Sequence, residues 1–304
     1  DVRGRLDGKG LTYFWTKICL VPVTDVSFQA DFEAQVNLPK ETLHLKIDPI
    51  STGLARFAVD LDLQRFSTKP KIKARFSIPE QGCQNVATAV PPVMIPRLVG
   101  SVFEGRMRFE VALGVDFKNV YGATLTVDAN VDDCRVLTFG PEVPLERLAG
   151  PYKHVVHEED VEEPIVVGPG TPSYVPLENI PAHVQQAALA TEDMGFFKHS
   201  GFKLGLIRRA VALNLDKGWY VYGGSTISQQ LVKNLFLSHE KTISRKVQEV
   251  FITWQLERTL PKEKILELYL NVIEWGPDVW GLRQAALHYF GKAPAELSLM
   301  ESAF

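Results

Sequence analysis

Residues 180–201 read IPAHVQQAALATEDMGFFKHSG, and this stretch decides the fold of the second half of the chain. Ile180-Pro181 predicts the start of a helix, because proline is favoured in the first helical turn. The apolar residues that follow recur at helical spacing: Val184, Ala187, Ala188 and Ala190. The predicted helix ends at Glu192, directly before a loop that contains two phenylalanines and a histidine.

Glu192 is the strongest candidate for acid–base chemistry in the chain. A carboxylate at a helix C-terminus lies at the negative end of the helix dipole, which favours its protonated form. Asp193 and the rings of Phe196 and Phe197 act in the same direction, and a general base that works near neutral pH needs such a raised proton affinity. Taken alone, Glu192 would more often be a solvated residue at a helix end. His199 is expected to fix the loop rather than to transfer a proton.

A second motif, GGSTISQQLVKN, covers residues 223–234. Its Gly-Gly-Ser-Thr turn leads straight into a predicted helix, whose free backbone N–H groups can face an anion. Most turns of this kind only cap a helix. The side chains that follow offer hydroxyls, amides and one cation for sugar or phosphate oxygens. They are Ser225, Thr226, Ser228, Gln229, Gln230, Lys233 and Asn234.

A third group, RKVQE at 245–249, places Arg245 and Glu249 on one face of a predicted helix. One interpretation is a surface ion pair that contributes little to stability. The other is that Arg245 and Lys246 hold a diphosphate, while Glu249 orients them or helps to bind a divalent ion, Mg²⁺ or Mn²⁺. The sequence leaves both open.

Outward from these motifs, the helical period continues to the end of the chain. Further helices are expected around 204–211, 227–235, 247–254, 265–269 and 285–289, the second of these capped by Ser225 or Thr226. We therefore expect a compact all-α domain over residues 177–304.

The first half of the chain has a period of two instead. In 26–36, VSFQADFEAQV, apolar and polar residues alternate throughout, and 57–63, 72–78, 107–117 and 125–131 repeat the pattern. Five such strands predict a curved antiparallel sheet covered on one side, or a flattened barrel. One helix is expected within 81–98, ended by Pro91-Pro92. The expected fold class is α+β, with an antiparallel β domain of unknown role at 1–145. Its charged face is interpreted as a solvated surface, and the alternative is a surface that binds a partner, a lipid or a glycan.

Prolines and the acidic run 158–163 separate the two halves, which predicts a linker at 146–176. The formal net charge of −3 gives no reason to expect nucleic acid as a partner. Cys83 and Cys134 either form a disulfide between two strand-rich segments, with Cys19 buried, or all three thiols are unpaired. The chain begins at Asp1 and stops within a helical pattern, so we expect a segment of a longer protein whose membrane anchor lies outside it.

In order and spacing, EDMGFFKHSG (192–201), GGSTISQQLVKN (223–234), RKVQE (245–249) and KILELYLN (264–271) resemble the motifs of peptidoglycan glycosyltransferases. These are the family 51 enzymes, found as monofunctional transglycosylases and in class A penicillin-binding proteins. A fifth stretch, NVIEWGPDVWGLRQAALHYFGK (271–292), is most similar to the monofunctional members. The resemblance covers roughly 165–304 and none of the β half. Family domains normally continue beyond the helix that contains Leu299 to Phe304, so the domain is expected to be truncated at its C-terminus.

The resemblance implies a lysozyme-like α fold that polymerises lipid II into glycan strands, with inversion and release of undecaprenyl diphosphate. By the match, Glu192 is the general base and Glu249 the second carboxylate, with or without the divalent ion. Lys233, Arg245 and Lys246 would neutralise the diphosphate, with Ser225 and Thr226 in the cradle. Gln229, Gln230 and Asn234 would position sugar or diphosphate oxygens; Asp193, Phe196 and His199 would shape the loop.

The implied partners are lipid II, the growing glycan strand and a membrane surface, to which the amphipathic segment 202–222 would contribute. The implied location is the extracytoplasmic, periplasmic side of the bacterial cytoplasmic membrane, and other envelope proteins are further implied partners, through the β domain. Two alternatives are a non-catalytic envelope module that binds lipid II or a partner, and a lysozyme-like enzyme that cleaves glycans. The latter would need a general acid and no diphosphate cradle.

Overall fold

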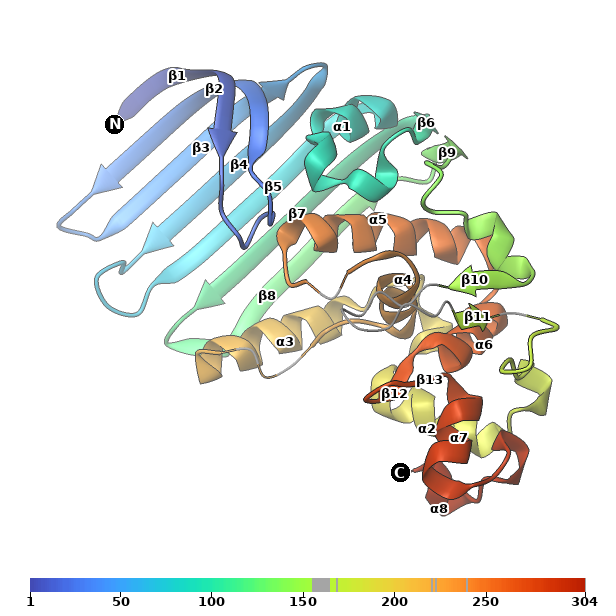
Figure 1. Cartoon of the computed structure of the whole chain (residues 1–304). Helices are drawn as coiled ribbons and strands as arrows, with labels where there is room; N and C mark the ends of the chain where they lie inside the picture. Colours follow the sequence, from blue (N-terminus) through green and yellow to red (C-terminus); the bar gives the residue numbers. More distant parts are fainter. Residues whose placement is uncertain (155–164, 168, 220, 222, 239, 304) are drawn as a thin grey trace. The chain divides into compact units, whose positions relative to one another are not determined.

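The computed structural model describes residues 1–154, 165–167, 169–219, 221, 223–238 and 240–303 (Figure 1). These residues form two compact units. The sheet unit comprises Asp1–Phe139 and Leu204–Gly224, and the helical unit comprises Gly140–Lys203 and Ser225–Phe304. The acidic run 158–163, predicted to be part of a linker, lies outside the described residues.

The sheet unit is built on seven antiparallel strands in the order β1-β2-β3-β4-β5-β7-β8. Their bounds are β1 Val2–Tyr13, β2 Val23–Asn37, β3 Thr42–Thr52, β4 Ala55–Gln64, β5 Lys71–Gly82, β7 Arg106–Asp116 and β8 Asn119–Asn130. The expected antiparallel sheet is confirmed. It is open rather than a flattened barrel, because β1 and β8 stand at its two edges and do not pair with each other.

The period of two in the sequence becomes a sheet with one apolar and one charged face. One row of apolar residues crosses six strands in register: Phe32, Ile47, Val59, Phe76, Val111 and Val127. On the opposite face, charged side chains pair across strands, as in Arg5–Asp31 at 2.7 Å and Arg108–Asp128 at 2.7 Å. This matches the solvated face that the sequence predicted.

The sequence missed two of the seven strands, β1 and β3. In β1, glycines occupy positions of the apolar face, where the alternating pattern requires apolar side chains. Gly4 faces Phe32 in the register, and a Cβ at Gly4 would lie 2.8 Å from the Phe32 ring. In β3, a bulge between Ile47 and Ile50 breaks the alternation. Both strands therefore lack the signal that identified the other five.

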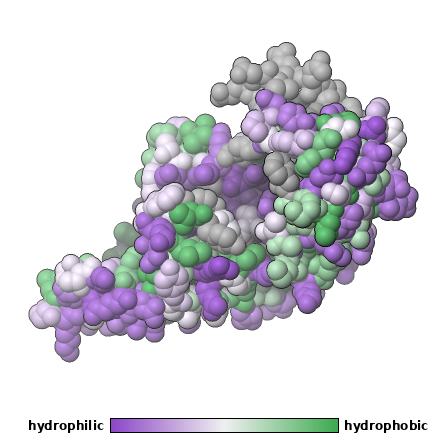
Figure 2. Space-filling model, turned by 90° about the horizontal axis from the view of Figure 1, so that it is seen from below, coloured by the Kyte–Doolittle hydropathy of each residue, from purple (hydrophilic) through white to green (hydrophobic). Residues whose placement is uncertain are grey.

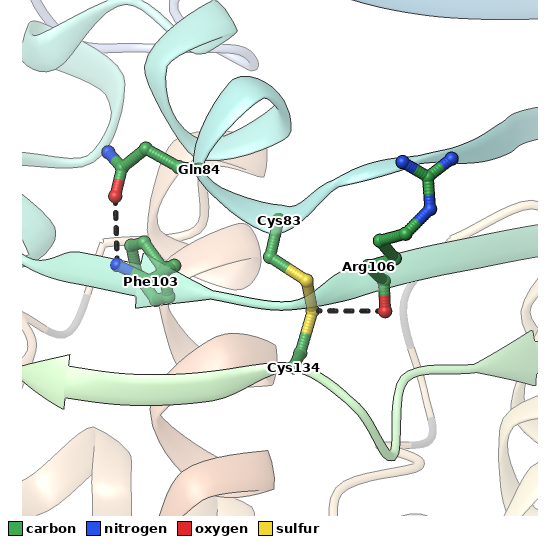
Figure 3. Close-up of a disulfide and its surroundings, with 5 residues drawn as sticks. All are labelled: Cys83, Gln84, Phe103, Arg106 and Cys134. Atoms are coloured by element: carbon green, nitrogen blue, oxygen red, sulfur yellow. Dashed lines mark hydrogen bonds between the residues drawn. A yellow bond between two sulfur atoms is a disulfide. The ribbon is translucent and has the colours of Figure 1, made fainter.

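A disulfide between Cys83 and Cys134 holds the excursion that separates β5 from β7 (Figure 3). This excursion contains helix α1 (Cys83–Ala89), the 3₁₀ turns η1 (Pro92–Met94) and η2 (Pro96–Leu98), and strand β6 (Val102–Glu104), which pairs with β9 (Arg135–Thr138). The backbone N–H of Phe103 donates to Gln84 Oε1 at 2.8 Å. Of the two possibilities that the sequence left open for the cysteines, the structure has the disulfide, with Cys19 free and buried. The helix expected within 81–98 is confirmed as α1.

Helix α3 (Leu204–Lys217) packs against β8 and therefore belongs to the sheet unit. The Tyr121 hydroxyl of β8 donates to Asp216 Oδ2 in the last turn of α3, at 3.0 Å. The helical period of this segment predicts that it belongs to the all-α domain at 177–304. The contacts place it with the sheet instead, where a helix beside the last strand shields that edge.

The helical unit contains the other predicted helices. They are α2 (Ala182–Glu192), α4 (Ile227–Phe236), α5 (Ile243–Thr259), α6 (Lys262–Val272) and α7 (Leu282–Phe290), with α8 (Leu299–Ser302) and the turns η3 (Leu145–Ala149), η4 (Leu177–Asn179), η5 (Phe196–Lys198) and η6 (Pro294–Glu296). Helix α4 packs on both α5 and α6. Its buried side chains Ile227, Leu231 and Val232 form part of the core with Ile252 and Leu268.

The expectation of an all-α domain over 177–304 was wrong in detail, because a short hairpin of β12 (Glu274–Gly276) and β13 (Val279–Trp280) occurs in it. A further hairpin pairs β10 (Tyr152–His154) with β11 (Ile165–Val167). The β10–β11 hairpin lies inside the predicted linker. None of the helices in the described residues has the length and apolar character needed to cross a bilayer. The surface seen in Figure 2 shows hydrophilic and hydrophobic residues side by side.

Candidate functional site

Glu192 is the last residue of α2, and its side chain is exposed. Gln230, on α4, donates from Nε2 to Glu192 Oε2 at 2.7 Å. The buried Tyr269 of α6 in turn donates from its hydroxyl to Gln230 Oε1 at 3.4 Å. Burial, together with the nearby charges of Glu192 and Asp193, raises the pKa of Tyr269, so this hydroxyl remains protonated. Three helices thus converge on the candidate base.

Asp193, the residue after α2, turns inward instead of sharing the surface with Glu192. It is 1% exposed, and its Oδ2 accepts from His199 Nε2 at 2.8 Å and from the backbone N–H of Ile227 at 3.4 Å. Phe196 is fully buried, with the ring of His199 edge-on to it at a centroid distance of 6.3 Å. These contacts support the loop-shaping role predicted for Asp193, Phe196 and His199.

Thr226 and Gln229 close the N-terminus of α4 as a capping box. Gln229 N–H donates to Thr226 Oγ1 at 3.3 Å, and Thr226 N–H donates to Gln229 Oε1 at 3.2 Å. The Thr226 hydroxyl also donates to Gly201 O at 2.7 Å. Both residues are buried with their polar atoms used inside the protein. In the structure both residues position the start of α4, and their direct contact with a ligand stays a prediction.

The buried carboxylate of Glu249 lies at the centre of a cationic cluster. Glu249 Oε2 accepts from Arg245 Nη1 at 2.5 Å, while Oε1 accepts from Lys246 Nζ and from Gln229 Nε2, the latter at 3.0 Å. Lys246 Nζ also donates to Ser225 Oγ at 3.2 Å. This contact joins the RKVQE helix to the GGST turn. Glu249 is thus a buried ion-pair partner of Arg245 and Lys246. This agrees with the interpretation that Glu249 orients the two cations.

Lys233, on α4, completes the cluster. Its burial, with the nearby charge of Arg245, lowers the pKa of Lys233, which means that its charged form lacks full compensation. The next residue, Asn234, is half-buried like Lys233. A half-buried lysine beside Arg245 and Lys246 is a place where an anion would relieve charge repulsion.

Helix α4 positions both halves of the site, because Gln230 contacts Glu192 and Lys233 belongs to the cationic cluster. The sequence did not single out Tyr269, although the residue lies within the KILELYLN motif. The sequence predicts only that this tyrosine lies in the core of a helical domain, and it does not indicate which group its hydroxyl contacts. Its role becomes visible only when α6 packs on α4.

Both carboxylate oxygens of Glu249, the residue predicted to help hold a divalent ion, accept hydrogen bonds from cations. Mg²⁺ or Mn²⁺ bound to Glu249 would therefore lie close to Arg245 and Lys246. In the described part of the chain, the one trio of potential ligand atoms close enough for an ion is His44, Asp60 and Asp62, on the sheet. A divalent cation requirement stays a prediction, and no step proposed below uses one.

The second half of the chain is similar to known proteins. Residues 165–304 match the family model described as Transglycosylase. The biosynthetic peptidoglycan transglycosylase of Nitrosospira multiformis is 50% identical over 130 residues, which are 43% of this chain and 56% of that protein. The enzyme of the same name from Nitrosomonas eutropha is 51% identical over 131 residues, or 43% and 54% of the two chains.

Penicillin-binding protein 1A/1B of Bacillus subtilis is 40% identical over 172 residues, 57% of this chain and 18% of that protein. The chain thus spans about half the length of the transglycosylases it matches. The matched region contains Glu192, Gln230, the cationic cluster and α3. Residues 165–304 of this chain are therefore similar to the transglycosylase family.

Proposed function

We propose that this chain is a peptidoglycan glycosyltransferase that polymerises lipid II into glycan strands. The observation that carries the proposal is the arrangement along α4. An exposed carboxylate, Glu192, is held by Gln230 of α4. One turn further along α4, Lys233 lies near the two cations of α5, Arg245 and Lys246. A base and an anion site that are both positioned by α4 suit a reaction in which a hydroxyl attacks a carbon that bears a phosphate leaving group.

In the proposed step, Glu192 removes the proton from the 4-hydroxyl of the acceptor sugar. The hydroxyl oxygen attacks the anomeric carbon of the donor from the face opposite the leaving group. The bond from that carbon to the diphosphate oxygen breaks, so the configuration inverts and undecaprenyl diphosphate leaves with the electron pair. Glu192 then returns its proton to solvent, which its exposed position allows.

Lys233, Arg245 and Lys246 would stabilise the charge that develops on the departing diphosphate. The buried Glu249 holds the Arg245 and Lys246 side chains in place, so they do not have to reorganise during the reaction. Glu249 does not suit the role of general acid in a glycan-cleaving enzyme, because it is buried and both its oxygens are occupied by hydrogen-bond donors. The geometry thus favours polymerisation over cleavage.

The same proposal includes a lysozyme-like arrangement of the helical unit, a membrane-bound substrate and action on the extracytoplasmic side of the bacterial cytoplasmic membrane. The relatives named for peptidoglycan synthesis support an envelope location. Lipid II and the growing strand are the proposed partners. The sheet unit is the proposed contact region for other envelope components.

The proposal is tested with the 304-residue chain and labelled lipid II. We expect glycan strands to form and Glu192→Gln to reduce the rate by at least about a hundredfold, within the usual contribution of a general base. Glu263→Gln is the matched control, since Glu263 is an exposed carboxylate in the first turn of α6. Lipid II binding without turnover would instead identify a non-catalytic module, and soluble fragments from purified sacculi would identify a cleaving enzyme.

A further inference from the structure

Three hairpin loops lie next to one another at one end of the sheet. They connect β2 to β3 (38–41), β4 to β5 (65–70) and β7 to β8 (117–118). Because neighbouring strands of this sheet run in opposite directions, every second connection lies at the same end. The loops are also hydrogen-bonded to each other. Arg65 N–H donates to Glu41 O at 2.9 Å, and Phe117 N–H donates to Pro70 O at 2.9 Å. We call these three loops the hairpin rim; Figure 1 shows these ends side by side.

Each loop of the rim combines a large apolar residue with a lysine. The pairs are Leu38 with Lys40, Phe66 with Lys69, and Phe117 with Lys118. Leu38 is 70% exposed and Phe66 39%, and all three lysines are exposed. Apolar tips that enter the lipid interface, surrounded by cations that meet headgroup phosphates, are the composition of a membrane-docking surface.

The charge of the rim is locally positive in a chain whose formal net charge is −3. The two acidic residues within or next to the three loops in sequence, Glu41 and Asp116, are both hydrogen-bonded to other groups of the protein. Asp116 Oδ1 accepts from Arg65 Nη2 at 2.6 Å and from Lys118 N–H at 2.9 Å, and Glu41 accepts from the Ser67 hydroxyl. Among the described residues, none of the three rim lysines takes part in an ion pair with an acidic side chain. Their charges therefore face outward uncompensated.

The apolar character of the rim continues along the adjacent face of the sheet. The row nearest the rim consists of Val36, Leu43, Leu63, Ile72 and Val115, in register across five strands. Val36 is 54% exposed. The end of α3 also lies here, because Asp216 is bonded to Tyr121 near the start of β8, and the exposed Trp219 follows two residues after Lys217. Tryptophan is a typical residue of the membrane interface.

We propose that the hairpin rim docks the sheet unit onto a bilayer with anionic headgroups. The opposite end of the sheet exposes apolar residues too, including Phe14, Trp15 and Leu20. The loop 14–22, which contains these three residues, has a single cation, Lys17, whereas the rim has three lysines. This loop would therefore be attracted less strongly to an anionic surface. Charge complementarity therefore selects the rim, and lysines near an anionic leaflet each add to the attraction.

The test is co-sedimentation of the 304-residue chain with phosphatidylcholine vesicles, with and without phosphatidylglycerol. We expect binding to require phosphatidylglycerol and to weaken with added salt. The charge reversal Lys40→Glu/Lys69→Glu/Lys118→Glu is expected to weaken it by at least about tenfold. Leu38→Ser/Phe66→Ser is expected to weaken it at every salt concentration, because the apolar contribution is not screened. Thermal unfolding checks that each variant is folded.

The matched control reverses three charges away from the rim, Lys9→Glu/Lys17→Glu/Arg56→Glu, and we expect it to bind nearly as well as the unmodified chain. An equal loss in this control, or equal binding to pure phosphatidylcholine, would overturn the proposal. A change of oligomeric state in the rim variants without any change in vesicle binding would identify a protein partner instead. The assay involves no turnover, so its result is independent of the proposed glycosyl transfer.

Discussion

The side-chain amide of Gln230 lies against the carboxylate of Glu192, with Nε2 2.7 Å from Oε2. The two residues are 38 positions apart in the sequence. A neutral donor at this place orients the carboxylate without forming an ion pair with it. The proposed base is therefore held by an amide, while Arg245 and Lys246 pair with Glu249 instead.

Replacing Gln230 should impair the chemical step. Gln230→Ala removes the donor, and Gln230→Glu places a second carboxylate beside Glu192, so we expect kcat on lipid II to fall by about tenfold or more in both. The larger fall is expected for Gln230→Glu. Steady-state kinetics are the measurement. An unchanged kcat in Gln230→Glu would show that Glu192 does not depend on this contact.

Tyr269→Phe should lower kcat through Gln230. Without the hydroxyl, the amide of Gln230 is free to flip and present its oxygen to Glu192; we expect a loss of about three- to tenfold in kcat with little change in KM. The loss should disappear in a Gln230→Ala background, because the two residues act in series. Tyr174→Phe is the matched control, since Tyr174 is buried and its hydroxyl donates to Glu267, outside the site.

Glu249→Gln should destabilise the protein and leave the cations in mutual repulsion. We expect a loss of about 1–3 kcal/mol in the free energy of unfolding, below the usual value for a fully buried pair because Lys246 is partly exposed. Inorganic pyrophosphate should restore more stability to this variant than to the unmodified chain. Thermal unfolding with and without pyrophosphate measures both effects, and equal shifts would argue against an anion site at Lys233, Arg245 and Lys246.

The Glu267 carboxylate predicts a pH dependence of stability. Burial alone would raise the pKa of Glu267, but the hydrogen bonds from Lys264, Tyr174 and the backbone of Leu177 bring it below its usual 4.5. A lowered pKa in the folded state stabilises the protein above about pH 4.5, and this contribution is lost as the pH falls further. Glu267→Gln should therefore cost about 1–2 kcal/mol at pH 7 and much less in acid. A cost independent of pH would contradict this account.

Reduction of the Cys83–Cys134 disulfide should destabilise the sheet unit. The two cysteines are separated by 51 residues in the sequence. A disulfide that closes a loop of this length usually adds about 2–4 kcal/mol to the free energy of unfolding. We expect dithiothreitol to lower the unfolding temperature of the unmodified chain. It should have no further effect on the Cys83→Ala/Cys134→Ala variant, which is the control. A reductant effect of equal size in that variant would point to another cause.

The sequence by itself determined the type of most elements and the order of the motifs. Alternation in 26–36 and the helical repeat after Ile180 are local properties, since each side chain's direction follows from its own few neighbours. The glycines of β1 and the bulge of β3 hid two strands because they interrupt that local signal. Glu192, Lys233 and Arg245 were recognisable for the same reason, as residue types at characteristic spacings.

Only the tertiary structure decided which polar groups meet. Thr226 and Gln229 proved to be buried caps, Tyr269 approached Glu192 through Gln230, and α3 packed on β8 rather than with the other helices. Each of these facts depends on the packing of elements far apart in the chain. Burial and hydrogen-bond partners arise when the apolar faces of those elements associate, and no short stretch of sequence contains that information.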